Sequence, residues 1–560
     1  MKENSSLRKW LSALGAAGVI AAVLVVVSCS RQDPGQANSS KSVRQPPGAE
    51  KGGEPEGVAQ GYQRGVDIAS SDDKKQSAAE GAKPIRLDVA PGEWPMFGGS
   101  PSRNMVNPND KDIVTEWSVE KGQEKNIKWT AEVGSKAYGG PVIVGDKILI
   151  GTNNEKPRDP KIQGDKGVLM CFRASDGKFL WQQVHDKLPA GRVNDWPDEG
   201  ICSTPAIEGD RFYYVSNRCD VICSDLDGKI LWRYDMIGKL NVFPHNLATC
   251  SPLVIGDLVY IVTSNGVDEG HVNIPSPNAP SFIAVNKQTG ELAWKQNYPA
   301  EKIMHGQWSN PAYSDAGGKP QVIFPGGDGY MYGLEPKTGD MIWKFDCNPK
   351  KSVYKLGSTG TRSDFLATPV VWENKLYIGV GQDPEHEEGV GHFWCIDVEK
   401  ATRLGPSAKD HDVSPVDDNF DPKADVNKNS ALLWHYGGPG DPEKLGRNYY
   451  FGRTLSTAAV REGLVYVGEL AGYLHCFDAM TGEHYWEHNS KAATWSSTYW
   501  VDGKVYLGND DKVVNVFAHG KEKKLLATND MDSAVRATPT GVKGVLYVLT
   551  ENKLYAIANK

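Results

Sequence analysis

Ionisable side chains that could form a binding surface recur at one kind of position, just before or just after short apolar segments of the chain. They are Asp195, Asp198, His245, His305, Arg362, Asp364, Arg453, Asp532 and Arg536. Carboxylates, guanidinium groups and imidazoles gathered at one rim would bind a polar or charged ligand. Their spacing assigns no catalytic step to any residue. We therefore expect a mixed-charge rim that binds a ligand or partner, with the catalytic residues unknown.

Five of the twelve histidines fall in segments that we expect to be loops on one side of the fold: His245, His271, His305, His386 and His392. Their spacings match no zinc pattern, because no two of the five form a His-x-x-x-His pair and the chain has no Cys-x-x-Cys pair. The sequence therefore predicts no metal site, and a metal bound by these loop histidines is the less favoured alternative.

Four cysteines occupy the same small-residue position in different repeats: Cys171, Cys223, Cys395 and Cys476. Equivalent positions in separate repeats are too far apart for a disulfide, so we interpret these thiols as small buried hydrophobic groups. A local bridge between Cys219 and Cys223 is the alternative. The disulfide pairing otherwise stays open.

The elements that would position these residues are repeated hairpins. Asp-Gly or Thr-Gly turns are followed four residues later by Trp, as at Gly177 before Trp181 and Gly482 before Trp486. Glycine supplies the positive φ of a tight hairpin turn, so the segments on either side are paired strands.

A second turn precedes each of these hairpins, and eight such turns occur between Gly145-Asp146 and Lys543-Gly544. A Pro, Ala or Thr stands before each, and recurring Pro is typical of an edge strand. The last repeat stops one strand short at Ile557, and residues 126–132 form a lone strand that can complete it. We therefore predict one all-β domain over 91–560, an eight-bladed β-propeller of four-stranded antiparallel blades, closed by the N-terminal strand.

The composition fits short strands joined by many turns, with 60 Gly and 34 Pro among 560 residues. The formal net charge is -8, and no run of Lys and Arg forms a basic patch. A surface that binds phosphate groups needs such a patch, so we expect no nucleic-acid partner.

The N-terminal residues have the pattern of an export signal. Basic residues precede an apolar run over 11–27, and Ser28-Cys29 follows. We interpret 1–29 as a lipoprotein signal with Cys29 as the lipid-bearing residue, or as an uncleaved anchor helix. Residues 30–90 are rich in Gly, Pro, Ser and charge, which predicts a flexible tether. Both readings place the rest of the chain in the cell envelope, outside the cytoplasm and anchored to a membrane.

The repeat over Leu474–Trp486 resembles those of the pyrroloquinoline-quinone (PQQ)-like eight-bladed propellers. The opening Trp94-Pro95-Met96-Phe97-Gly98-Gly99, followed by Arg103-Asn104, is similar to the first segment of proteins in that superfamily. The resemblance implies that the outer-strand Trp of each blade docks against its neighbour. The residues are Trp129, Trp181, Trp232, Trp294, Trp343, Trp434 and Trp486.

The resemblance leaves two functions open, because the superfamily holds BamB-type lipoproteins and quinoprotein dehydrogenases. Three long loops on one face, 153–167, 264–280 and 381–391, favour binding of protein partners. The chain lacks the Cys-Cys pair and the Cys-x-x-Cys-His motif of many quinoproteins. We therefore expect a binding or scaffold module, and the resemblance implies outer-membrane protein assembly as its role. The alternative is an alcohol or sugar dehydrogenase that uses PQQ with calcium.

Overall fold

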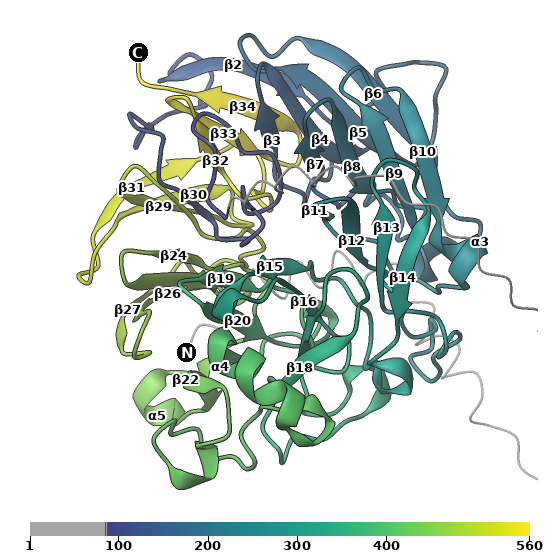
Figure 1. Cartoon of the computed structure of the whole chain (residues 1–560). Coiled ribbons are helices and arrows are strands. Elements are labelled where there is room, and N and C mark those ends of the chain that lie inside the picture. Colours follow the sequence, from purple (N-terminus) through teal and green to yellow (C-terminus); the bar gives the residue numbers. More distant parts are fainter. Residues whose placement is uncertain (1–84, 86) are drawn as a thin grey trace, which may run out of the picture. The chain divides into compact units, whose positions relative to one another are not determined.

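The computed structural model describes residue 85 and residues 87–560. The expected signal segment, most of the expected tether and Cys29 lie outside these residues. The described chain forms eight separate β-sheets arranged in a ring, which confirms the predicted propeller (Figure 1). Within the described residues, no helix is long and apolar enough to cross a membrane.

Each sheet is a blade with four strands that run antiparallel from the innermost outward. They follow chain order in blades 1 to 7, whereas the outermost strand of blade 8 comes from the N-terminal part of the described chain. In blades 1 to 4 the strands are β3 (Val142–Val144), β4 (Lys147–Asn153), β5 (Lys166–Arg173), β6 (Phe179–Asp186); β7 (Ala206–Glu208), β8 (Arg211–Val215), β9 (Asp220–Asp225), β10 (Ile230–Asp235); β11 (Leu253–Ile255), β12 (Leu258–Val262), β13 (Phe282–Asn286), β14 (Leu292–Gln296); and β15 (Ala312–Ser314), β16 (Gln321–Pro325), β17 (Tyr330–Leu334), β18 (Met341–Asp346).

Blades 5 to 8 follow the same plan, with two added strands. Their strands are β19 (Val370–Trp372), β20 (Lys375–Val380), β21 (His392–Asp397), β22 (Leu432–Pro439), with β23 (Tyr449–Phe451) added; β24 (Ala459–Arg461), β25 (Leu464–Gly468), β26 (Tyr473–Asp478), β27 (His484–Asn489); β28 (Tyr499–Val501), β29 (Lys504–Gly508), β30 (Val513–Ala518), β31 (Leu525–Asp530), with β1 (Val106–Asn107) added; and β32 (Thr540–Val542), β33 (Val545–Leu549), β34 (Lys553–Ile557), β2 (Ile127–Glu132).

The two ends of the described chain close the ring, as predicted. Strand β2 pairs antiparallel with β34, with Trp129 opposite Ala556 and Glu132 opposite Lys553. Figure 1 shows β2 beside the yellow β34. Because the outermost strand of blade 8 comes from the opposite end of the chain, hydrogen bonds within one sheet join the first blade to the last.

Apolar side chains between neighbouring blades form the core. Phe282 of blade 3, for example, stacks on Phe324 of blade 4 with ring centroids 4.7 Å apart.

The outer-strand tryptophans also join neighbouring blades by hydrogen bonds. In six of the seven, the indole Nε1 donates a hydrogen bond of 2.8–3.2 Å to a backbone carbonyl of the next blade. In five of these pairs the glycine of the next blade's hairpin turn lies against the indole ring, as Gly177 does against Trp129.

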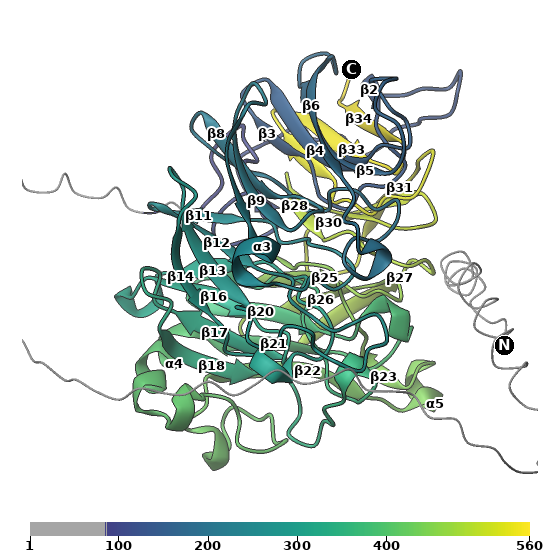
Figure 2. The same ribbon diagram turned by 90° about the vertical axis from the view of Figure 1, so that its right-hand side faces the viewer.

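Trp343 differs from the other six because blade 5 has no tight hairpin for it to contact. Its Nε1 donates to Oε1 of Gln321 in its own blade, at 2.6 Å. Residues 398–431 replace that hairpin and include α4 (Val398–Leu404), which packs near β18 (Figure 2).

The other described α-helices are α3 (Met236–Leu240) and α5 (Pro442–Leu445), and the 3₁₀ helices are η1 (Gly191–Val193), η2 (Ala300–Lys302), η3 (Ala316–Gly318), η4 (Leu356–Ser358), η5 (Pro384–His386), η6 (Gly405–Ser407), η7 (Lys409–His411) and η8 (Asp425–Asn427).

Residues 94–107 cross the ring and bond to every blade. We call this stretch the crossing segment. Its hydrogen bonds reach residues on or next to the innermost strand of each blade in turn: Ile143, Ile207, Pro252, Tyr313, Val371, Val460, Trp500 and Gly541. These residues lie near the turn between first and second strands. The crossing segment therefore lies at the end of the ring away from the loops between second and third strands.

Arg103 is the centre of the crossing segment. Its side chain is fully buried, and its Nε and Nη atoms donate to the carbonyls of Phe97, Ser251, Pro252 and Pro311 at 2.8–3.0 Å. Burial lowers the pKa of the guanidinium to about 10, so the group is charged at neutral pH. One side chain thus joins blades 3 and 4 to the crossing segment through backbone acceptors.

The cysteines of the described chain are free thiols. Cys171, Cys223, Cys395 and Cys476 are all buried, in agreement with the small-hydrophobe interpretation. Burial raises the pKa of these thiols, to about 11 for Cys223 and about 12 for Cys171 and Cys476. They are therefore protonated and poorly nucleophilic at neutral pH.

Candidate functional site

The sequence-predicted residues lie in loops at one end of the ring. Loops between second and third strands cover residues 154–165, 263–281 and 381–391 in blades 1, 3 and 5. By the up-and-down order of the strands, the segments that lead into each innermost strand emerge at the same end. We call this end the loop face and the end with the tight hairpins the hairpin face.

The three rim arginines already have protein partners. Nη2 of Arg362 lies 2.6 Å from Oδ1 of Asp346. Arg536 pairs with Asp510 at 3.0 Å and with Glu551 at 2.6 Å. An anionic ligand at this rim would therefore have to compete with carboxylates for both guanidinium groups.

Arg453, the third rim arginine, bonds to neutral groups instead. Its Nη atoms donate to the backbone carbonyls of His386 and Glu387 and to the side-chain oxygen of Gln382. These bonds fasten the 381–391 loop to the segment that leads into blade 6.

Two rim aspartates are also engaged, and a third lies in a turn. Asp195 is buried and accepts from Lys187, from Asn217 at 2.8 Å and from the backbone of Leu188 at 2.9 Å. Asp532 pairs with Lys553 at 3.4 Å. Asp198 has a φ of 64° and belongs to the loop that leads into blade 2.

Asp364 differs from these aspartates because its buried carboxylate has no partner in the described chain. The residue is 1% exposed, and neither carboxylate oxygen accepts a hydrogen bond. Its backbone pairs with Gly381, which lies against Arg453. Burial, and after it the nearby Asp383, raises the pKa of Asp364 well above its ordinary value of 3.8.

Replacing Asp364 with Asn should stabilise the protein at neutral and alkaline pH. The folded state binds the proton more tightly than the unfolded chain does, so the free energy of unfolding falls as pH rises above 3.8. We expect Asp364→Asn to raise the free energy of unfolding at pH 8 by roughly 1–3 kcal/mol and to flatten this fall. Urea denaturation across pH, with a chelator present, measures both.

Asp195→Asn is the matched control for that measurement. Asp195 is also a buried rim carboxylate, but Lys187 and Asn217 bond to it. Burial raises the pKa of Asp195 as well, but its bonds to Lys187 and Asn217 oppose that shift. Its replacement should therefore stabilise the protein less than Asp364→Asn does at pH 8. An equal or larger gain from Asp195→Asn would show that Asp364 is not the unpartnered charge.

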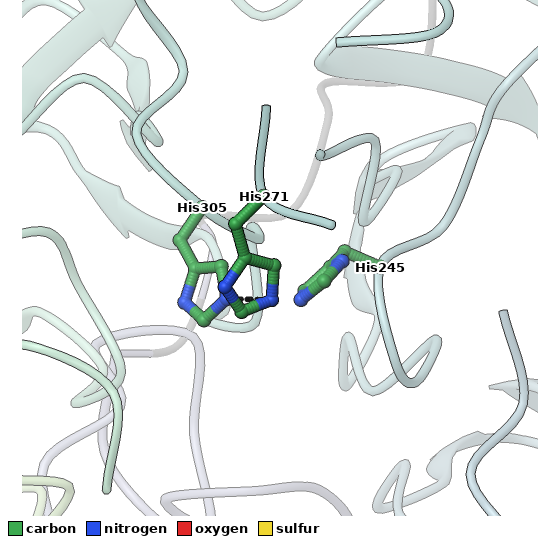
Figure 3. A group of neighbouring side chains, drawn as sticks. All are labelled: His245, His271 and His305. Carbon is green, nitrogen blue, oxygen red and sulfur yellow. Dashed lines mark hydrogen bonds between the residues drawn. The ribbon is translucent and has the colours of Figure 1, made fainter. Parts of the chain in front are cut away.

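Three histidines from separate loops meet at the loop face. His245 leads into blade 3, His271 lies in the 263–281 loop, and His305 leads into blade 4. Their ring centroids are 4.4 to 5.0 Å apart, and one nitrogen from each lies within 4.8 Å of the others. Figure 3 shows the three side chains together, each on a separate stretch of the chain. We call this group the His triad.

Burial disfavours the charged form of two members of the His triad, His245 and His305. It lowers the pKa of His245 to about 4 and that of His305 well below its ordinary 6.5. The imidazoles of His245 and His305 are therefore neutral near pH 7, the form that binds metal ions. His271 was among the loop histidines noted from the sequence, but its distance of 26 residues from His245 and 34 from His305 gave no sign of this contact.

A second group, of two histidines and a glutamate, also places possible ligand atoms close together: His475, His484 and Glu487. Its histidine nitrogens already have hydrogen-bond partners. His475 Nε2 lies 2.6 Å from Glu469, its Nδ1 lies 3.1 Å from His484, and the remaining nitrogen of His484 contacts Tyr436. This group is part of a hydrogen-bonded network between blades 5 and 6.

Comparison with known proteins identifies the family. A family profile described as "Outer membrane protein assembly factor BamB" matches residues 165–417 and 424–560, which is most of the chain. The chain belongs to this BamB family. Membership agrees with the eight-bladed ring and with the resemblance noted from the repeats.

Relatives with known activities are more distant than the family match. The chain is 23% identical over 462 residues to methanol dehydrogenase [cytochrome c] subunit 1 of Methylobacterium organophilum, covering 74% of this chain and 67% of the relative. It is 22% identical to polyvinylalcohol dehydrogenase of Sphingopyxis sp., covering 57% of this chain and 50% of the relative. The chain thus spans half to two thirds of these relatives.

One solved structure supports the fold. Quinohemoprotein alcohol dehydrogenase ADHIIG of Pseudomonas putida HK5 is 16% identical, with a TM-score of 0.53, and covers 82% of this chain and 75% of its own. At this identity the likeness shows the propeller architecture alone.

Proposed function

We propose that this BamB-family chain is a membrane-anchored binding module of the cell envelope, and that its loop face takes a protein partner, namely an outer-membrane protein during assembly. The observation that carries the proposal is a group of exposed apolar side chains on the loop face. Val272, Val353 and Tyr354 are 69%, 48% and 37% exposed. Exposed apolar groups beside a polar rim are typical of protein-binding surfaces.

These three side chains belong to two loops that contact each other. Gly357 lies against His271, the neighbour of Val272, and Tyr354 donates from its hydroxyl to the carbonyl of Ile303 at 3.2 Å. The loops are thus held by the scaffold and present their apolar side chains outward. The loops at 153–167 and 381–391 would extend the same surface.

A photo-crosslinking amino acid at position 272, in cells that make the full chain, tests the proposal. We expect an adduct with an outer-membrane protein, identified by mass spectrometry. The matched control is position 480, because Met480 is 50% exposed but lies in a hairpin turn of blade 6 on the hairpin face. Equal adducts at both positions, or none at 272, would contradict the proposal.

A quinoprotein oxidoreductase is the second candidate, favoured by the dehydrogenase relatives and by Asp364, whose buried oxygens suit a calcium ion. The cofactor itself fits poorly. PQQ is a polycarboxylate, whereas Arg362 and Arg536 are ion-paired and Arg453 bonds to carbonyls. We therefore derive no reaction step through PQQ. Dye reduction with added alcohol, PQQ and calcium would favour this candidate over the scaffold.

A further inference from the structure

One nitrogen atom of the His triad points to a missing ligand. Nε2 of His245 is buried, lies beside the other two imidazoles and has no hydrogen-bond partner within the described chain. Most buried polar atoms are hydrogen-bonded, so this nitrogen calls for an explanation.

The tautomer of His245 suits a metal ligand. Its Nδ1 lies 2.8 Å from the carbonyl of Val267, which can only accept, so Nδ1 carries the proton. The unpartnered Nε2 then presents its lone pair to the triad. A ligand histidine that donates its other ring N–H to a backbone carbonyl is the usual outer-shell arrangement at metal sites.

The spacing of the other two histidines also suits a metal ion. Nε2 of His271 and Nε2 of His305 lie 3.2 Å apart. Two nitrogens about 2.0–2.1 Å from a tetrahedral Zn²⁺ would be separated by about 3.3–3.4 Å. The observed separation therefore needs little change on metal binding.

Backbone hydrogen bonds join the three loops that carry the His triad. The N–H of His245 donates to Ser264 at 3.1 Å, and the N–H of Val267 donates to His305 at 3.0 Å. Gly266 sits between them, where a Cβ would come within 2.7 Å of the Cβ of His245. These bonds fix the backbone positions of the three loops, so the imidazoles lie close together without a bound ion.

We propose that His245, His271 and His305 form a binding site for a divalent transition-metal ion such as Zn²⁺, with one coordination position left open on the loop face. Three histidine ligands and an open position are the donor set of several catalytic zinc sites. His386 lies beside the triad, with its ring centroid 5.8 Å from that of His305. The inference goes beyond the proposed partner binding and does not depend on it.

Calorimetric titration of the chelator-treated, untagged full chain with Zn²⁺ tests the site, with Co²⁺ absorption as a second readout. We expect one ion per chain and the spectrum of tetrahedral Co²⁺. His271→Gln should weaken binding at least 100-fold, because the loss of even an outer-shell partner costs about 10- to 100-fold. His271 is partly exposed in a loop, so the variant should fold.

His484→Gln is the matched control, since His484 belongs to the saturated second group. Its zinc affinity should equal that of the unchanged protein. The proposal is overturned if the unchanged protein shows no saturable binding near one ion per chain. It is also overturned if His271→Gln binds Zn²⁺ as the unchanged protein does, or if His484→Gln loses binding and His271→Gln keeps it.

Discussion

A chain that ends at Asn552 is expected to lose its cooperative fold. The truncation removes β34, which pairs with β33 on one side and with β2 on the other. Without it the ring opens inside blade 8, between β33 and β2, and these two strands become exposed edges.

The energetic loss should be comparable with the whole stability of the protein. Leu554, Tyr555 and Ile557 are each at most 4% exposed. Burial of three such side chains contributes roughly 5–9 kcal/mol, and the net stability of a native protein is about 5–15 kcal/mol. We therefore expect no sharp thermal transition by circular dichroism and rapid proteolysis.

The control is a chain that ends at Ala558. It lacks only Asn559 and Lys560, which are exposed, and keeps every pair between β2 and β34. Its melting curve should match that of the full chain. A cooperative transition in the chain that ends at Asn552, near the normal temperature, would show that the ring does not depend on closure by β2 and β34.

Arg103→Met should give the largest destabilisation among single substitutions. The change leaves the carbonyls of Phe97, Ser251, Pro252 and Pro311 without their buried donor. Each unsatisfied buried group costs about 1–3 kcal/mol, and relaxation recovers part of the total. We expect the free energy of unfolding to fall by about 3–5 kcal/mol in urea denaturation.

Arg173→Met is the matched control, because Arg173 is also hydrogen-bonded but lies in an exposed hairpin with Asp176 as its partner. Surface ion pairs contribute about 0–1 kcal/mol, so its effect should be small. If the two variants lost similar amounts of stability, Arg103 would not be the link that the structure indicates.

The repeats predicted the fold because each carries its own turn and strand signals. A turn glycine and a Trp at a fixed distance after it indicate a hairpin from the local sequence alone. Eight copies of the same unit then predict a closed ring. The crossing segment was visible only as an opening motif around Trp94 and Arg103. Its path could not be predicted, since its partners stand as far as 434 residues away, at Gly541.

The candidate site could be predicted only as a set of loop residues. The sequence placed His245 and His305 at the rim, but zinc motifs describe ligands close in the chain. The His triad draws its members from three loops of two blades. The ion pairs of the rim arginines could not be predicted either. Arg362, for example, pairs with Asp346, which lies at the end of the outer strand of the preceding blade.

The pairing of β2 with β34 also imposes an order on biosynthesis. Ile127 can pair with its partner Ile557 only after Ile557 has been synthesised, 430 residues later (557 minus 127). At about 5–20 residues per second, that interval is roughly 20–90 s. Throughout it, β2 lacks its final partner, and the crossing segment acquires its last partner, Gly541, only near the end. The nascent chain therefore spends most of its synthesis with an unpaired strand that a chaperone can bind, and the fold becomes complete only after its last residues are made.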